Sequence, residues 1–167
     1  METSDPTRLP EFPTATRDRL AASSVARAEN IAVLRRRLTA WLRETGLDAD
    51  TVDDLVLATS EALENVCDHA FTTAEQPGTM TLSADIGGAP DPLDPTPHVV
   101  ITVTDDGAWQ PRTDEPTSRG RGLSMIGILA AHHTVTSTLG GTVVTLAHPV
   151  AGVLDPSATA PQERPIG

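Results

Sequence analysis

The chain has 167 residues, enough for one domain of ordinary size, and a second full domain is not expected. Its 12 Lys+Arg against 23 Asp+Glu give a formal net charge of −11, which argues against a protein that holds nucleic-acid phosphates through a general positive field. Hydrophobic residues make up 38% but aromatic residues only 2%, so we expect an aliphatic core. The single Cys67 excludes an intrachain disulfide and a zinc site built from several cysteines.

The two ends of the chain differ in composition from its middle. Residues 1–15 and 151–167 are rich in Pro, Thr, Ser and charge without an apolar period, which predicts disordered tails around one domain at 16–150. The first residues lack the basic start and apolar stretch of a secretory signal, and no apolar run approaches the roughly 20 residues of a membrane span. We therefore expect a cytoplasmic protein without membrane contact.

The first half of the domain predicts a short strand and two helices. A strand around 17–24 leads into a helix in which apolar residues recur at helical spacing from Ile31 to Leu42. Acidic residues from Asp48 onward open a second helix that continues to Ala70, because carboxylates are favourable near the positive end of the helix dipole.

The second half predicts four strands and one helix. Residues 79–86 and 98–104 have strand character, and the Gly/Pro/Asp-rich stretch 87–97 between them predicts a long hairpin loop. An apolar helix then begins near Leu123, and strands at 133–139 and 142–148 flank a tight glycine hairpin. This order is not the repeated βαβ of a parallel sheet, so we predict an α+β two-layer sandwich with helices on one face.

One stripe of the second helix carries side chains suited to chemistry. Glu61, Asn65 and His69 are spaced at i, i+4 and i+8 and therefore lie above one another. A glutamate can take a proton there, and the amide oxygen of an asparagine one turn away can coordinate Mg²⁺. The alternative is a solvated polar face, which the spacing leaves open.

Two loops could also bind a ligand. Asp105-Asp106-Gly107 ends an apolar strand, so a carboxylate there is half-buried and needs donors, while Gly107 permits close approach of a flat ligand. The alternative is an ordinary Asp-Gly turn. Gly120-Arg121-Gly122 offers bare amides before a helix, which could hold an anion or simply cap the helix.

The order of these motifs along the chain favours the functional interpretation. The motifs are SEALENVCDH at 60–69, DDGAW at 105–109, GRG at 120–122 and GT at 141–142. Together they resemble the N, G1 and G2 boxes and the terminal Gly-Thr of the GHKL ATPases. The resemblance covers about residues 16–148 and is closest to the small bacterial anti-sigma-factor serine/threonine-protein kinases.

This resemblance implies a Bergerat-fold, histidine-kinase-like ATPase domain. Its nucleotide pocket would lie between the helices and a mixed, mostly antiparallel sheet, and its ligands would be ATP and Mg²⁺. By the same resemblance, Glu61 is the general base, Asn65 is the Mg²⁺ ligand, and Asp105 accepts a hydrogen bond from the adenine amino group.

The resemblance also assigns the remaining contacts to the nucleotide. Gly107 is where the backbone passes close to the base, Gly120 and Gly122 form the phosphate lid, and Thr142 lies near the adenine.

Some features depart from the family pattern or stand outside it. Trp109 replaces the second glycine of the G1 box, and the 87–97 loop is longer than a minimal hairpin needs. Glu64 and Asp68 add negative charge beside the expected metal. In addition, two arginines lie close to the expected phosphates, where a solvated role is the alternative; they are Arg119 and Arg121.

The resemblance implies an ATP-binding anti-sigma regulatory factor. Such a protein is a serine/threonine-protein kinase that phosphorylates an anti-sigma-factor antagonist, sequesters a sigma factor and forms a homodimer, without contacting nucleic acid directly. Two alternatives stay open from the sequence. One is a nucleotide-sensing module that binds a partner without phosphotransfer, and the other is an interaction protein that uses no nucleotide.

Overall fold

The computed structural model describes residues 19–70, 77–87, 93–107, 121–138 and 140–150. The predicted tails 1–15 and 151–167 lie outside the described residues. The elements in chain order are β1 (Arg19–Val25), α1 (Ala28–Arg43), α2 (Ala49–Asn65), the π-helical turn η1 (Val66–Ala70), β2 (Thr79–Gly87), β3 (His98–Asp105), α3 (Arg121–Leu129), β4 (His132–Thr138) and β5 (Gly141–Pro149).

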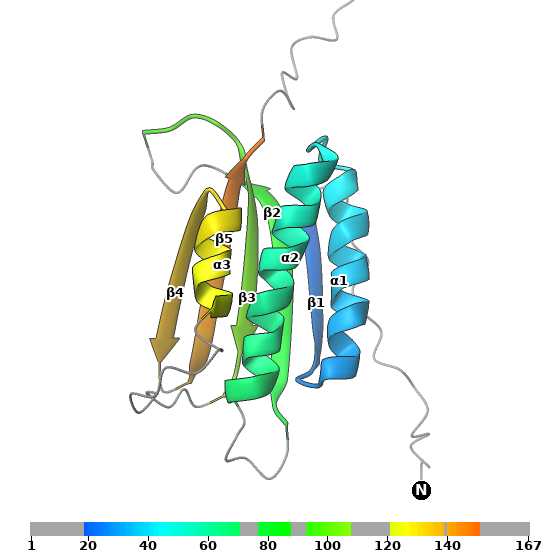
Figure 1. The fold of residues 1–167 in the computed structure, drawn as a ribbon, viewed down its shortest axis with the longest axis vertical. Helices are drawn as coiled ribbons and strands as arrows, with labels where there is room; N and C mark the ends of the chain where they lie inside the picture. The colour runs from blue at the N-terminus through cyan, green and yellow to red at the C-terminus, as the bar shows by residue number, and fades with distance from the viewer. Residues whose placement is uncertain (1–18, 71–76, 88–92, 108–120, 139, 151–167) are drawn as a thin grey trace, which may run out of the picture.

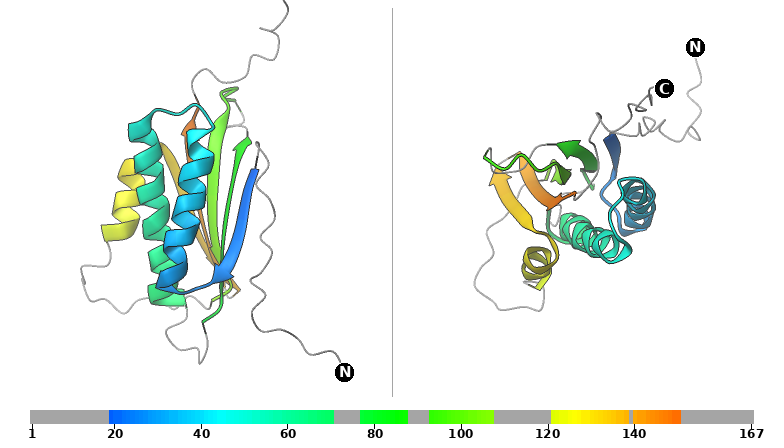
Figure 2. Two further views of the ribbon diagram at one scale, coloured as in Figure 1. Left: turned by 90° about the vertical axis from the view of Figure 1, so that its right-hand side faces the viewer. Right: turned by 90° about the horizontal axis from the view of Figure 1, so that it is seen from above.

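The five strands form one sheet in the order β1-β2-β3-β5-β4, and α1, α2 and α3 lie side by side on one of its faces (Figures 1 and 2). The predicted α+β two-layer sandwich is therefore confirmed. The predicted sheet was mixed, whereas every strand pair among the described residues is antiparallel. The reason is that β5 lies between β3 and β4, so these two strands run in the same direction without pairing.

The core lies between the sheet and the helices and is aliphatic, as predicted. Every second residue of the central strands faces the helices and is buried, as the pleat of a strand requires. The largest fully buried side chains come from both layers: Leu34, Leu38, Leu42, Leu55, Leu63, Met80, Leu82, Ile101, Ile126 and Leu146. This burial fixes α2 and α3 against the central strands.

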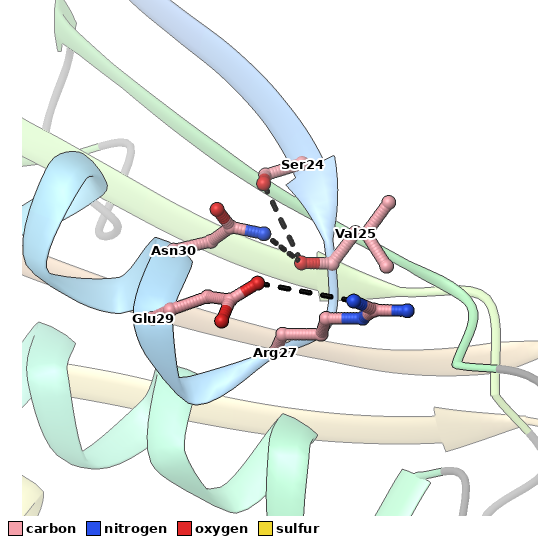
Figure 3. Close-up of polar contacts among 5 residues, drawn as sticks. All are labelled: Ser24, Val25, Arg27, Glu29 and Asn30. Atoms are coloured by element: carbon pink, nitrogen blue, oxygen red, sulfur yellow. Dashed lines mark hydrogen bonds and ion pairs between the residues drawn. The ribbon is translucent and has the colours of Figure 1, made fainter.

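The helix starts are fixed by local hydrogen bonds. Between β1 and α1 the carbonyl of Val25 accepts from Nδ2 of Asn30 at 2.9 Å (Figure 3). The same carbonyl also accepts from the Arg27 N–H at 2.8 Å, which turns the chain into the helix. At the start of α2, Asp48 accepts from the Thr51 N–H at 2.9 Å, and this bond lowers the pKa of Asp48. The predicted acidic start of the second helix is thus a capped N-terminus.

The loop between β2 and β3 belongs to a hairpin, as predicted, because the two strands pair antiparallel. Its last residues are held to the sheet: the Val150 N–H donates to the Pro97 carbonyl (2.8 Å), and Nδ1 of His98 lies 2.8 Å from the Thr96 carbonyl. His98 is only 1% exposed, and its ring centroid lies 5.8 Å from that of His132. This loop end therefore packs at the end of the sheet where β5 finishes.

Candidate functional site

The elements that carry the predicted site meet at one end of the molecule. At the lower end in Figure 1, α2 finishes, β3 finishes, β5 begins and α3 begins. The end of α2 and the start of β5, which are 76 residues apart in the chain, are thus brought to the same end of the molecule by the sheet order and by the packing of α2 against α3. At this end the helical layer and the sheet meet, and the resemblance places a nucleotide between them.

Asp105 stands at the tip of β3 and is held by two main-chain donors. Its Oδ1 accepts from the N–H of Gly107 at 2.9 Å and from the N–H of Thr142 at 3.4 Å. Three predicted site residues are therefore joined in one hydrogen-bonded junction. Burial raises the pKa of Asp105, and the two backbone hydrogen bonds oppose that shift. Both main-chain donors bond Oδ1, and the side chain of Thr142 also hydrogen-bonds this carboxylate, so Oδ2 receives neither of the two main-chain bonds.

Gly141 is a site residue that the sequence-based assignment omitted. Its φ is +135°, and a Cβ built on it would lie 1.8 Å from the backbone oxygen of Asp105. Only a glycine lets β5 begin this close to the end of β3, and this closeness brings the Thr142 N–H to Asp105. The sequence signals were the Gly140-Gly141 hairpin and the Gly-Thr motif at 141–142, of which only Thr142 was assigned to the nucleotide.

We expect Gly141→Ala to lower the free energy of unfolding by about 3 kcal/mol, because the methyl group overlaps backbone and the φ is strained. Urea denaturation checks this. Gly140→Ala is the matched control, since a Cβ there meets nothing closer than the Thr138 hydroxyl oxygen at 3.8 Å. Equal stability of the two variants would contradict the close approach.

Asp106 has a different environment from its neighbour Asp105. It is exposed, and its Oδ1 accepts from the Thr79 N–H of β2 at 2.7 Å. The side-chain hydrogen bond of the Asp-Gly turn considered in the sequence analysis is made by Asp105 to the Gly107 N–H, whereas Asp106 bonds across to β2.

The stripe on α2 carries one unsatisfied group. The amide Nδ2 of Asn65 is buried and has no hydrogen-bond partner within the described part of the chain. Such a group costs about 1–3 kcal/mol when nothing binds it, so it fits a ligand oxygen. Glu61, one turn before it, is partly exposed, and no hydrogen bond or ion pair of its carboxylate occurs among the described residues. Ser60 is structural, because its hydroxyl donates to the Val56 carbonyl at 2.7 Å.

Comparison with known proteins decides the family. Residues 24–148 match the histidine kinase-like ATPase domain, which is most of the chain. The chain belongs to the histidine kinase-like ATPase domain family. The predicted resemblance to the GHKL ATPases is thereby confirmed.

Two solved structures resemble this ATPase domain. The RsbU and RsbW domains of Rv1364c from Mycobacterium tuberculosis align with a TM-score of 0.60 and 26% sequence identity, over 79% of this chain and 32% of that one. This chain thus spans about a third of the length of the chain in that structure. The histidine kinase domain of a blue-light activated histidine kinase from Erythrobacter litoralis EL346 aligns with a TM-score of 0.42 and 22% identity, over 72% of this chain and 60% of that one.

The predicted lid of the ATPase domain is described only at its end. Gly122 lies in the first turn of α3, and the start of this helix lies at the same end of the molecule as the end of β3 (Figure 1). Gly120 and Arg119 lie outside the described residues, as does the side chain of Arg121. The assignment of Gly120, Gly122 and the two arginines to phosphate binding stays a prediction.

The described residues contain no cluster of the side chains that most often bind metal ions. Across the described ranges, no group of three or more His, Cys, Asp or Glu side chains could hold a metal ion. The assignment of Asn65 as a Mg²⁺ ligand stays a prediction. Among the described helices, none is long and apolar enough to cross a membrane.

The extra acidic residues of α2 and η1 lie beside α1. Glu64, Cys67 and Asp68 line a groove of about 400 Å³, and the other wall comes from α1, including Ile31 and Arg35. Burial raises the pKa of Cys67, and the charges of Asp68 and Glu64 raise it further. Cys67 is therefore a protonated thiol at neutral pH, and Glu64 belongs to this groove.

Proposed function

We propose that this protein is an ATP-binding anti-sigma regulatory factor, a serine/threonine-protein kinase that phosphorylates an anti-sigma-factor antagonist. The observation that carries the proposal is the likeness to a structure containing an RsbW domain, at 26% identity over 79% of this chain. The motifs at 60–69 and 105–109 support the same class of kinase. A sigma factor as second partner and a homodimeric state belong to this proposal.

The residues at the site fit ATP and Mg²⁺. A half-buried carboxylate with an available oxygen suits an exocyclic amine, and Asp105 provides it. The buried Nδ2 of Asn65 without a partner suits a phosphate oxygen, and the amide oxygen of the same side chain would be the Mg²⁺ ligand. The start of α3, a helix of nine residues, would present the N–H groups of its first turn to an anion.

Each of these residues has a separate task in phosphoryl transfer. Bound MgATP supplies the γ-phosphoryl group, whose bond to the ADP oxygen breaks as a bond to the partner's serine oxygen forms. Glu61 takes the proton of the serine hydroxyl through its carboxylate. Asn65 holds the metal through its amide oxygen and donates from Nδ2, while Asp105 fixes the base.

The test is incubation of the purified protein with labelled ATP and candidate antagonist proteins encoded nearby. We expect nucleotide binding and transfer of label to a serine of one antagonist. Binding without transfer to any candidate would favour the partner-binding module. An absence of nucleotide binding would leave an interaction protein.

We expect Asn65→Ala to weaken MgATP binding by roughly 10–100-fold and to reduce phosphotransfer as well, because the metal ligand is lost. Calorimetry with and without Mg²⁺ measures the first effect. Glu64→Gln is the control, because Glu64 lies on the adjacent helix position but faces the groove with α1. An Asn65→Ala variant that binds MgATP like wild type would refute the assignment.

A further inference from the structure

Where β2 begins and β3 ends, a side-chain oxygen takes the place of a main-chain carbonyl as a hydrogen-bond acceptor. The last register pair of these strands joins Met80 to Asp105. One residue farther, the Asp106 N–H donates to the Thr79 carbonyl at 3.3 Å, as an antiparallel ladder requires. The reciprocal bond differs, because the Thr79 N–H donates at 2.7 Å to Oδ1 of Asp106 and not to its main-chain carbonyl.

This exchange has a consequence for the path of the chain. Since the carboxylate of Asp106 completes the ladder, the main-chain carbonyl of this residue is released and the backbone can leave the strand here. The next residue, Gly107, is buried and turns its N–H back to Oδ1 of Asp105 at 2.9 Å. The strand end, the turn and the carboxylate of Asp105 are thus formed by three successive residues.

We infer that Asp106 is a positioning residue for base recognition: its hydrogen bond to Thr79 fixes the turn that holds Oδ1 of Asp105 and leaves Oδ2 for the nucleotide. This inference rests on the proposed nucleotide site. Asp106 itself is exposed and belongs to the outer side of the turn, so it acts through Asp105 and not by touching the ligand.

Thr79, the donor of this hydrogen bond, is itself held in place by neighbouring segments. Thr79 is the first residue of β2 and pairs with Val25 at the end of β1. The preceding Gly78 accepts from the Ala26 N–H at 2.9 Å. Asp106 is therefore tied to a point that two other segments hold in place, and its bond can fix the end of β3 relative to the sheet.

The hydrogen bond and the charge of Asp106 act on Asp105 in opposite ways. Burial is the main cause that raises the pKa of Asp105, and the neighbouring charge of Asp106 also raises it, which disfavours the ionised acceptor. The hydrogen bond to Thr79, in contrast, holds the acceptor in place. Asp106→Asn removes the charge and retains an acceptor oxygen, whereas Asp106→Ala removes both.

The experiment compares these two variants with wild type in the full chain. Calorimetry measures affinities for ATP and GTP, and NMR hydrogen exchange follows the amides of Thr79, Gly107 and Thr142 in the ligand-free proteins. For Asp106→Ala we expect ATP affinity to fall about tenfold, a smaller ATP/GTP ratio, and faster exchange at Thr79 and Gly107. Asp106→Asn should stay close to wild type in all three measurements.

Two outcomes would overturn the inference. One is an Asp106→Ala variant with wild-type exchange at Gly107 and wild-type nucleotide preference; the other is equal loss in both variants, which would assign the effect to charge. Amides of the central strands, such as those of Leu82 and Ile101, report whether the fold is intact. If wild type binds no nucleotide, the proposed function fails, while exchange in the ligand-free variants still tests the positioning role.

Discussion

Glu61→Gln is expected to slow phosphoryl transfer to the partner serine by about 10²–10⁴-fold, the usual contribution of a general base. Its affinity for ATP should stay within about twofold of wild type, because the carboxylate acts on the acceptor hydroxyl and not on the nucleotide. Single-turnover transfer from labelled ATP measures the rate, and calorimetry measures the affinity. The structure supports this separation, since the Glu61 carboxylate has no partner among the described residues whose loss would disturb the site.

Glu64→Gln is the matched control for this variant. It makes the same chemical change on the same helix, but the side chain lies in the groove beside α1. We therefore expect its transfer rate to equal that of wild type. A Glu61→Gln variant that phosphorylates as fast as wild type would refute the general base and favour the partner-binding module.

The sequence predicted the elements because their signals are local. Apolar spacing from Ile31 to Leu42 and the β-branched run in 98–104 each fix one face of one element, and both elements form as predicted. The helix predicted to Ala70 instead changes to a π turn after Asn65. The insertion of β5 between β3 and β4 depends on long-range pairing, which no single segment encodes.

The two aspartates before Gly107 show what local signals leave undetermined. Both are aspartates within two residues of a glycine, so residue type alone does not show which of them faces the site. The pleat does separate them: Ile101, Val103 and Asp105 share the side of β3 that faces the core, and Asp106 has the other side. The sequence marks Gly141 as part of a hairpin and of the Gly-Thr motif, but it does not show the contact with Asp105, which lies 36 positions earlier in the chain.

Asp105→Asn is expected to reverse the nucleotide preference of the site. In wild type, Oδ1 of Asp105 is held by the N–H groups of Gly107 and Thr142, which leaves Oδ2 as an acceptor for the amine of adenine. In the asparagine variant the same two donors orient the amide oxygen toward themselves, so Nδ2 takes the place of Oδ2 and becomes a donor. A donor matches the carbonyl that guanine has where adenine has its amine.

Calorimetry with ATP and GTP measures this reversal. Wild type should prefer ATP by at least about 10²-fold, because a site built to accept from an amine leaves a buried group unpaired with the wrong base. Asp105→Ala should lose the preference without reversing it, since it offers neither donor nor acceptor. Equal affinity of wild type for both nucleotides, or an unchanged ATP preference in Asp105→Asn, would refute this role of Asp105.

The pH dependence gives the same assignment a second test. Burial raises the pKa of Asp105 above that of an ordinary aspartate, so this carboxyl gains its proton at a higher pH when solutions are acidified. The protonated group no longer offers an ionised acceptor to adenine, and ATP affinity of wild type should therefore fall as the pH drops through this raised value. The amide introduced by Asp105→Asn does not titrate in this range, so the affinity of this variant for GTP should not fall with pH in the same way. If the affinities of both proteins fall together as the pH drops, another group causes the decline.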